Sequence, residues 1–294
     1  KSEAIGLAVM TELPLVIVDV QRGGPSTGLP TKPEQADLNQ ALWGRNGECP
    51  LVVMAASTPS DCFHYAFWAG KIAMEHMTPV LLLSDGFIAN GSEPWRIPSM
   101  KEYPKITPPI VTRAPEGGFH PYARDEKRLA RMWALPRTKG VEHRVGGLEK
   151  DSLSGAVSHD PENHERMVGL RAAKVARVQD FIPKQEVVGG RRGELLVVGW
   201  GGTYGHLLTA VRELQRRGEQ VSLCHFNFIH PLPRGVREIF SRFRRIVVCE
   251  LNEGQFAAYL RQNFQEFPYE QYNKCEGLPF TVAELKQKFE SLLK

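Results

Sequence analysis

The sequence predicts an α/β protein with parallel sheets, because short apolar runs alternate with amphipathic stretches in two separate parts of the chain. The length of 294 residues suits two domains. Hydrophobic residues make up 42% and charged residues 24%, which is enough apolar side chain to bury a core and argues against a disordered chain. Residues 183–193 combine Pro, a Gly pair and charge, so we expect one domain over 1–185 and another over 190–294.

The first part opens with a predicted helix over 3–10, followed by the β-branched run Leu15–Val20, which is typical of a strand buried on both faces. Two more apolar runs predict strands, and two amphipathic stretches predict helices, the second capped by Ser60 or Asp61. The alternation of strands and helices predicts parallel βαβ units. These strands are expected at 51–55 and 79–84, and the helices at 33–43 and 60–77.

Residues 89–164 lack this clear alternation, since Pro, Gly, Arg and His are frequent and only 125–133 has a helical pattern. An irregular stretch of this length inside a domain is usually functional or faces a partner. A helix is expected again at 165–179. The second part then predicts a complete α/β domain, with strands at 195–199, 221–226 and 245–250 and helices at 203–217, 233–243, 254–264 and 281–293.

Charge and cysteine usage exclude several classes of protein. The 37 Lys and Arg against 33 Asp and Glu leave a net charge of +4, too small and dispersed to indicate a nucleic-acid partner. The longest apolar runs are far shorter than the roughly 18 residues of a membrane span, so no membrane partner is expected. The five cysteines form no CxxC pair, which argues against an iron–sulfur or zinc site in this chain and suits the reducing cytoplasm.

The densest functional signal is the glycine-rich segment 20–32, which follows a predicted strand and precedes a predicted helix. Ligands of open α/β sheets bind at the carboxyl ends of strands, so this loop lies where a site is expected. The Arg22 guanidinium offers a planar fork for a carboxylate or phosphate. An ordinary strand-to-helix connection is the alternative, because it would contain similar turn residues.

Three other features have structural alternatives. Gly199–Gly205 resembles a dinucleotide-binding fingerprint, but Tyr204 occupies a position where that motif needs Gly, so a tight turn that helps an interface is favoured. Asp85 is either a helix cap or an interface residue near a cofactor. The spacing of four histidines matches no helical pair of metal ligands, so no metal site is expected at His120, His143, His159 and His164.

The segment VDVQRGGPSTGLPTKPEQADL closely resembles the alpha subunit of 2-oxoacid:ferredoxin oxidoreductases, especially of the 2-oxoglutarate type. The similarity covers essentially the whole chain through the motifs SDCF, TPVLLLSDG, GGLEKD, DPENHERM, GGTYG and ELNEGQ. The resemblance implies thiamine-dependent oxidative decarboxylation of 2-oxoglutarate to succinyl-coenzyme A, with electrons passed to ferredoxin. A pyruvate or branched-chain 2-oxoacid oxidoreductase and a non-catalytic assembly module remain the alternatives.

The same resemblance implies that 1–185 is the later part of a thiamine-pyrimidine-binding domain and 190–294 a transketolase C-terminal-like domain. Arg22 and Thr31 would face the carboxylate and the side chain of the substrate. The beta subunit of the hetero-oligomer would hold most of the thiamine diphosphate site, the Mg²⁺ and a [4Fe-4S] cluster. Five further loop residues would lie near cofactor or substrate, namely Gln21, Gly23, Gly24, Ser26 and Thr27.

One departure from the family is large, because the family's N-terminal domain and the early pyrimidine-domain segment are absent from this sequence. That segment would contain a substrate-binding threonine in a YPITP-type motif and the glutamate that protonates the aminopyrimidine. Glu3 would lie on the next helix, so we interpret it as a packing or surface residue. This chain alone is therefore expected to lack a complete catalytic set and to be inactive without the rest of the enzyme.

Overall fold

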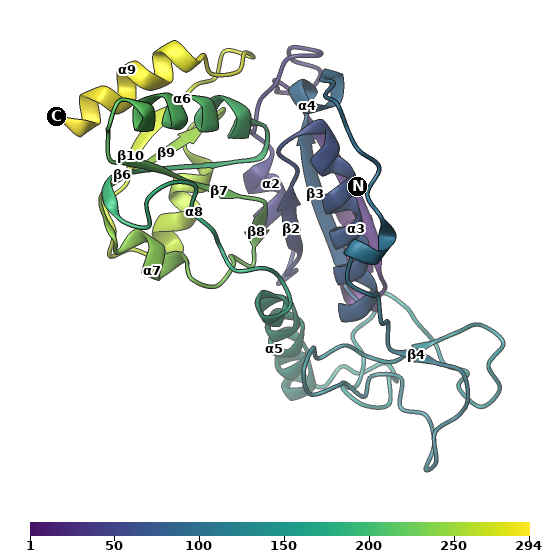
Figure 1. Ribbon diagram of the computed structural model, residues 1–294. Coiled ribbons are helices and arrows are strands. Elements are labelled where there is room, and N and C mark those ends of the chain that lie inside the picture. The colour runs from purple at the N-terminus through teal and green to yellow at the C-terminus, as the bar shows by residue number, and fades with distance from the viewer.

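The computed structural model describes residues 1–294 and contains two four-stranded sheets that lie side by side, together with a small two-stranded sheet (Figure 1). The first part of the chain holds α1 (Ser2–Thr11), β1 (Leu15–Gln21), α2 (Leu38–Trp43), β2 (Val52–Ala55), α3 (Pro59–His76), β3 (Pro79–Asp85), α4 (Gly86–Asn90), β4 (Ile110–Val111), β5 (Trp133–Ala134) and α5 (Pro161–Arg177). The second part holds β6 (Gly193–Trp200), α6 (Tyr204–Arg216), β7 (Val221–Phe226), β8 (Phe228–His230), α7 (Val236–Phe240), β9 (Phe243–Glu250), α8 (Gln255–Asn263), β10 (Glu270–Asn273) and α9 (Val282–Leu293). No helix is both long and apolar enough to cross a membrane.

The first sheet has the order β1-β3-β2-β8. β3 pairs in parallel with β1 and with β2, which confirms the predicted parallel units. The fourth strand was not predicted, because β8 has only three residues and comes from the second part of the chain. It pairs antiparallel with β2, so the second part of the chain completes the sheet of the first.

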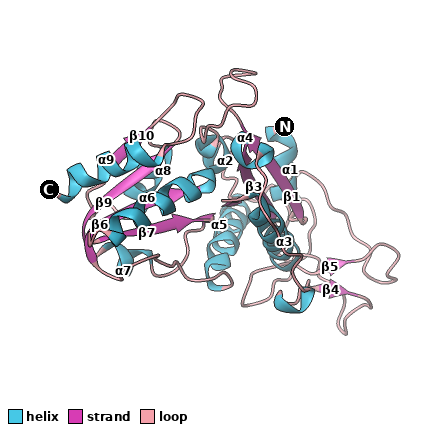
Figure 2. Cartoon of the chain, turned by 45° about the horizontal axis from the view of Figure 1, so that its top comes forward, coloured by secondary structure: helices cyan, strands magenta, loops and turns pink.

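The second sheet has the order β10-β9-β6-β7, and all of its pairs are parallel. Helices cover both of its faces, as Figure 2 shows, which is the α/β layout that the sequence predicts. Successive residues of β6 point to opposite faces: Leu195 and Val197 pack with α6 and α9, whereas Leu196 and Val198 pack with α7 and α8.

The two parts of the chain share one hydrophobic core. A cluster of 26 buried residues joins Val53 and Leu81 of the first sheet to Leu196 and Val198 of the second. The opposite face of the first sheet packs on α3, through alternate residues such as Met54 and Leu82. The predicted boundary between 185 and 190 lies between the main strands of the two sheets, but β8 crosses into the first sheet and the two halves bury apolar surface against each other.

The prediction that β1 is buried on both faces is wrong. This strand lies at the edge of its sheet, and Val18 and Val20 are 58% and 51% exposed. A β-branched run indicates that a strand forms, but whether both faces of the strand are covered depends on which elements pack against it.

Four predicted helices have different bounds or caps in the structure. The helix predicted over 165–179 is α5, which begins at Pro161, where Asp160 caps it. The helix predicted over 33–43 begins only at Leu38, because the backbone before it bonds to the second part of the chain. The helix predicted over 233–243 is limited to Val236–Phe240, since the residues from Phe243 onward join β9. α3 is capped by Thr58, whose hydroxyl accepts a hydrogen bond from the Asp61 N–H at 3.2 Å, and not by Ser60 or Asp61.

The helix predicted over 125–133 is absent. The Asp125 carboxylate accepts hydrogen bonds from the N–H groups of Lys127, Arg128 and Ala130, which closes a turn and leaves no helical ladder. The long irregular segment around it forms loops near the bottom of Figure 1, whereas the loop after β1 lies near the top. These loops contact the end of α1 and the end of α3, so they lie at the amino ends of β1 and β3.

Candidate functional site at the carboxyl ends of the strands

The glycine-rich loop after β1 is closed by backbone hydrogen bonds. The Gly23 N–H donates to the Lys32 carbonyl at 2.9 Å, and the Leu29 N–H donates to the Gly23 carbonyl at 2.8 Å. Gly28 has a φ of 46°, and a Cβ there would lie 2.1 Å from the Gly23 oxygen, so only Gly fits. The loop therefore has one defined shape set by its backbone.

Two non-glycine residues of this loop adopt left-handed backbone conformations. Ser26 has a φ of 55° and Thr31 a φ of 65°. This region is unfavourable for a β-branched residue such as Thr, and such strained positions cluster at binding and catalytic sites. The strain at Thr31 is independent support for the interpretation of this loop as functional.

Arg22 is exposed and makes no hydrogen bond or ion pair within the chain, so its guanidinium is free to bind an anion. It lines a groove of about 830 Å³ together with Gly24 and Ser26. The opposite wall of this groove comes from the second part of the chain. Its residues there are Asn252, Glu253, Gln255 and Cys275.

The groove is rich in carboxylates, since Asp19, Glu34, Asp37 and Glu253 line it beside Arg22. Burial, and repulsion by Asp37, raise the pKa of Asp19 to about 6. Burial also raises the pKa of Asp37. Carboxyl groups with raised pKa in a groove are typical of functional sites, although structural clusters can have the same property.

The other predicted residues do not all face this groove. Gln21 is buried: its side chain donates to the Ser84 carbonyl at 3.3 Å and accepts from the Asp37 N–H at 3.2 Å. Thr27 and Thr31 are exposed and lie outside the groove lining. The Thr31 carbonyl faces the start of α4, 3.5 Å from where a Cβ of Gly86 would lie.

Gln35 was not singled out from the sequence, yet it is fully buried at the junction of the two parts. Its side chain donates to the Trp200 carbonyl at 2.7 Å and accepts from the Leu251 N–H at 3.0 Å. Its backbone N–H donates to the Leu251 carbonyl at 2.9 Å, and its carbonyl accepts from the Asn252 side chain at 2.8 Å. A polar residue within a predicted amphipathic helix carries no sequence signal for such a role.

The glycines after β6 serve this junction. Gly201 has a φ of 55°, and a Cβ there would lie 2.9 Å from the Gln35 Nε2. A Cβ on Gly202 would lie 2.1 Å from a carboxylate oxygen of Asp85. The motif is thus a tight turn between the two parts of the chain, in agreement with the interpretation favoured over a dinucleotide site.

Asp85 caps α4, because its carboxylate accepts hydrogen bonds from the N–H groups of Phe87 and Ile88 at 2.8 and 2.9 Å. Burial raises the pKa of this carboxyl group, while the N–H groups of Ile88, Phe87 and Gly202 oppose that rise. Of the two alternatives weighed from the sequence, the structure supports the helix cap, and this cap also contacts the second part of the chain.

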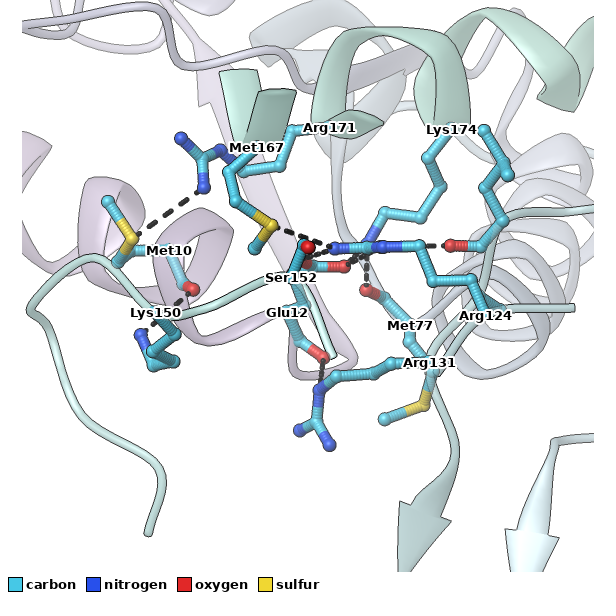
Figure 3. Close-up of polar contacts among 12 residues, drawn as sticks. Met10, Glu12, Met77, Arg124, Arg131, Lys150, Ser152, Met167, Arg171 and Lys174 are labelled. Carbon is cyan, nitrogen blue, oxygen red and sulfur yellow. Dashed lines mark hydrogen bonds and ion pairs between the residues drawn. The ribbon is translucent and has the colours of Figure 1, made fainter. Parts of the chain in front are cut away.

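A second polar cluster lies at the opposite end of the sheet and was missed by the sequence analysis (Figure 3). The Glu12 carboxylate is paired with Arg124 and with Lys174, at 2.5 Å each. Arg131 donates to the Glu12 carbonyl at 3.1 Å, and Lys174 also donates to the Met77 carbonyl at 2.7 Å. The cluster fastens the irregular segment and α5 to the end of α1.

The remaining candidates have local roles. Glu3 is exposed on α1. His143 contacts the Val141 carbonyl and His164 contacts the Glu149 carboxylate. No three His, Cys, Asp or Glu side chains gather where they could hold a metal ion, and all five cysteines are free.

Comparison with known proteins gives a consistent picture. Residues 1–159 match the family described as "Pyruvate flavodoxin/ferredoxin oxidoreductase, thiamine diP-bdg". The chain is 49% identical over 286 residues to the 2-oxoglutarate oxidoreductase subunit KorA of Mycobacterium tuberculosis, which covers 97% of this chain and 43% of that protein. It is 32% identical over 254 residues to the 2-oxoglutarate synthase subunit KorA of Methanothermobacter marburgensis, covering 86% of this chain and 66% of that protein.

One solved structure is similar to this chain over its whole length. The 2-oxoglutarate:ferredoxin oxidoreductase from Magnetococcus marinus, solved with 2-oxoglutarate, coenzyme A and succinyl-CoA bound, superposes with a TM-score of 0.93 at 31% identity. The match covers 100% of this chain and 51% of that chain. The present chain thus spans about half the length of that protein and less than half of its Mycobacterium tuberculosis relative.

Proposed function

Because this chain belongs to the pyruvate flavodoxin/ferredoxin oxidoreductase family with a thiamine diphosphate-binding domain, we propose that it is part of the alpha subunit of a 2-oxoglutarate:ferredoxin oxidoreductase. The whole enzyme would convert 2-oxoglutarate and coenzyme A to succinyl-coenzyme A and carbon dioxide. The two electrons released would reduce ferredoxin. The observation that carries the proposal is the identity of 49% over nearly the whole chain to a subunit named as a 2-oxoglutarate oxidoreductase.

In this proposal Arg22 anchors the 2-oxoacid carboxylate. Its guanidinium has no partner in the chain, lies at the carboxyl end of a parallel strand and is carried by a loop of defined shape. A guanidinium binds a carboxylate through two parallel hydrogen bonds, which orients the substrate as well as holding it. Thr31 would contact the substrate side chain, and its strained backbone supports such a role.

Thiamine diphosphate would supply the stabilised carbanion that decarboxylation requires. The groove beside Arg22 does not fit the diphosphate end of this cofactor, because four carboxylates line it and no metal-binding cluster is present. A beta subunit would hold the diphosphate, the Mg²⁺ and a [4Fe-4S] cluster, and ferredoxin would dock on the assembled enzyme.

The test is an assay of the full-length subunit assembled with its partner subunit. With coenzyme A and ferredoxin present, 2-oxoglutarate should give succinyl-coenzyme A and reduced ferredoxin. Pyruvate and branched-chain 2-oxoacids should give much lower kcat/KM, and a preference for either of them would replace the proposed substrate. The 294-residue chain alone should show no turnover. If the assembled complex reduces ferredoxin with none of these 2-oxoacids, the proposed function is wrong.

A further inference from the structure

We propose that Gln35 is a positioning residue for Arg22: it holds the segment that closes the Arg22 loop against the ends of β6 and β9. The inference rests on the proposed function only for the role of Arg22 toward a substrate. The anchoring itself is a property of the chain and can be tested without any substrate.

All four polar groups of Gln35 are bonded to residues of the second part of the chain. The carboxamide spans from the Trp200 carbonyl, at the end of β6, to the Leu251 N–H, just after β9. The backbone adds the bonds to the Leu251 carbonyl and to the Asn252 side chain. Buried hydrogen bonds of this kind define position, because losing one partner leaves the other group unsatisfied.

This anchor lies close to the Arg22 loop along the chain. Lys32 accepts the bond that closes the loop, and only Pro33 and Glu34 separate it from Gln35. The Glu34 carboxylate in turn accepts a hydrogen bond from the Gly24 N–H at 3.4 Å. A shift of Gln35 would therefore be transmitted to both sides of the loop that carries Arg22.

The residues that follow Gln35 are also bonded to the second part of the chain. The Gln255 side chain donates to the Ala36 carbonyl at 2.8 Å and accepts from the Asn39 N–H at 2.9 Å. Gln255 also lines the groove beside Arg22. The two walls of the groove are thus joined by a short series of hydrogen bonds, with the buried Gln35 at its centre.

A carboxamide is the group that this position requires, since it offers one donor side and one acceptor side. Glu at position 35 would present an acceptor to the Trp200 carbonyl, and Met would keep the volume but remove both bonds. Room for the carboxamide depends on Gly201, where a Cβ would lie 2.9 Å from its nitrogen. The Gln and the Gly, 166 positions apart (201 − 35), therefore form one fitted contact.

The first experiment measures how readily a protease cleaves the loop that carries Arg22, in the absence of substrate. Limited digestion of the full-length protein by trypsin, followed by mass spectrometry, reports cleavage after the exposed Arg22. Gln35→Met and Gln35→Glu should each speed this cleavage roughly tenfold, whereas Asn39→Ala, which removes an exposed side chain without hydrogen bonds, should not. Cleavage after Arg144, in the irregular segment, serves as the internal control and should stay constant. Equal cleavage after Arg22 in all variants would show that Gln35 does not hold the loop.

The second experiment links the anchor to Arg22 in the assembled enzyme. Gln35→Met should raise KM for the 2-oxoacid roughly tenfold while kcat changes less than about threefold, because the contact of Arg22 with the carboxylate is made in the bound substrate as well as in the transition state. In the background of Arg22→Ala the same change should have almost no further effect, since coupled residues are not additive. If the effects of Gln35→Met and Arg22→Ala on KM multiply in the double variant, the inference is wrong. Absence of 2-oxoacid turnover in the wild-type complex would instead overturn the proposed function and leave the digestion result valid.

Discussion

The Nζ of Lys174 donates a hydrogen bond to the Glu12 carboxylate at 2.5 Å, although the two residues are 162 positions apart. Both side chains are buried, and Arg124 binds the same carboxylate. Burial alone would raise the pKa of Glu12, but Lys174 and Arg124 outweigh it and lower the pKa to about 2. This cluster attaches α5 and the irregular segment to the amino end of the first sheet, opposite the Arg22 groove.

Replacing Glu12 should strongly destabilise the fold. Glu12→Gln removes the negative charge and leaves Arg124 and Lys174 buried without a counter-charge, which should lower the free energy of unfolding by about 3–5 kcal/mol. Chemical denaturation at neutral pH measures the loss. Glu3→Gln, on the exposed face of α1, is the matched control and should change stability by less than about 0.5 kcal/mol. A loss for Glu12→Gln no larger than for this control would contradict the assignment.

His76 should make the protein less stable in mild acid. Its ring is 1% exposed and neither nitrogen has a hydrogen-bond partner; burial, with Arg128 and Lys174 nearby, lowers its pKa from 6.5 to about 4. The unfolded chain takes up a proton near pH 6.5, whereas the folded protein does not until about pH 4. Stability is therefore fully present above pH 6.5 and falls as the pH drops through this window.

Between pH 7 and pH 5 the contribution of His76 should be about 2 kcal/mol. The measurement compares urea denaturation of the wild type and of His76→Gln at both pH values. The variant should lose less stability on acidification, by about that amount. Parallel curves for the two proteins would show that His76 does not remain neutral in the folded state.

Gly202→Ala should disturb the junction between the two parts of the chain. The added Cβ would lie 2.1 Å from the carboxylate of Asp85, which cannot move without releasing its cap on α4. The expected cost is roughly 1–3 kcal/mol, measured by thermal denaturation. Gly205→Ala is the control, because a Cβ there meets nothing within 4 Å and Ala favours the helix. Similar melting temperatures for the two variants would rule out a close fit at Gly202.

Arg22→Ala should lower kcat/KM of the assembled enzyme for a 2-oxoacid by roughly 10- to 150-fold, because hydrogen bonds to charged groups contribute about 1.5–3 kcal/mol. Arg22→Lys should recover only part of this loss, since Lys keeps the charge without the planar fork. Thr31→Ala should act more weakly and change the preference among 2-oxoacids. Arg22 is exposed, so its replacement should leave the melting temperature unchanged. A change of kcat/KM within about twofold would show that the carboxylate is held elsewhere.

Local patterns in the sequence were sufficient to predict several strands, which are short apolar runs bounded by turn residues. The predicted strand over 221–226 coincides with β7, and the strand predicted over 79–84 extends by one residue in β3. The glycine-rich loop was also identified from the sequence, because Gly28 is required by a bond within the loop itself. The loop depends on contacts between residues close along the chain, and the two strands are recognisable because each is a bounded apolar run.

Only the tertiary structure decided the rest. The exposure of Val18, the late start of α2, the strand β8 and the roles of Gln35 and Glu12 all depend on partners from distant parts of the chain. A periodic pattern shows which side chains must be buried, but not which element will bury them. The sequence by itself therefore determined the α/β class and the loop that carries Arg22, and the packing of the two parts determined where that loop is held and which buried charges are paired.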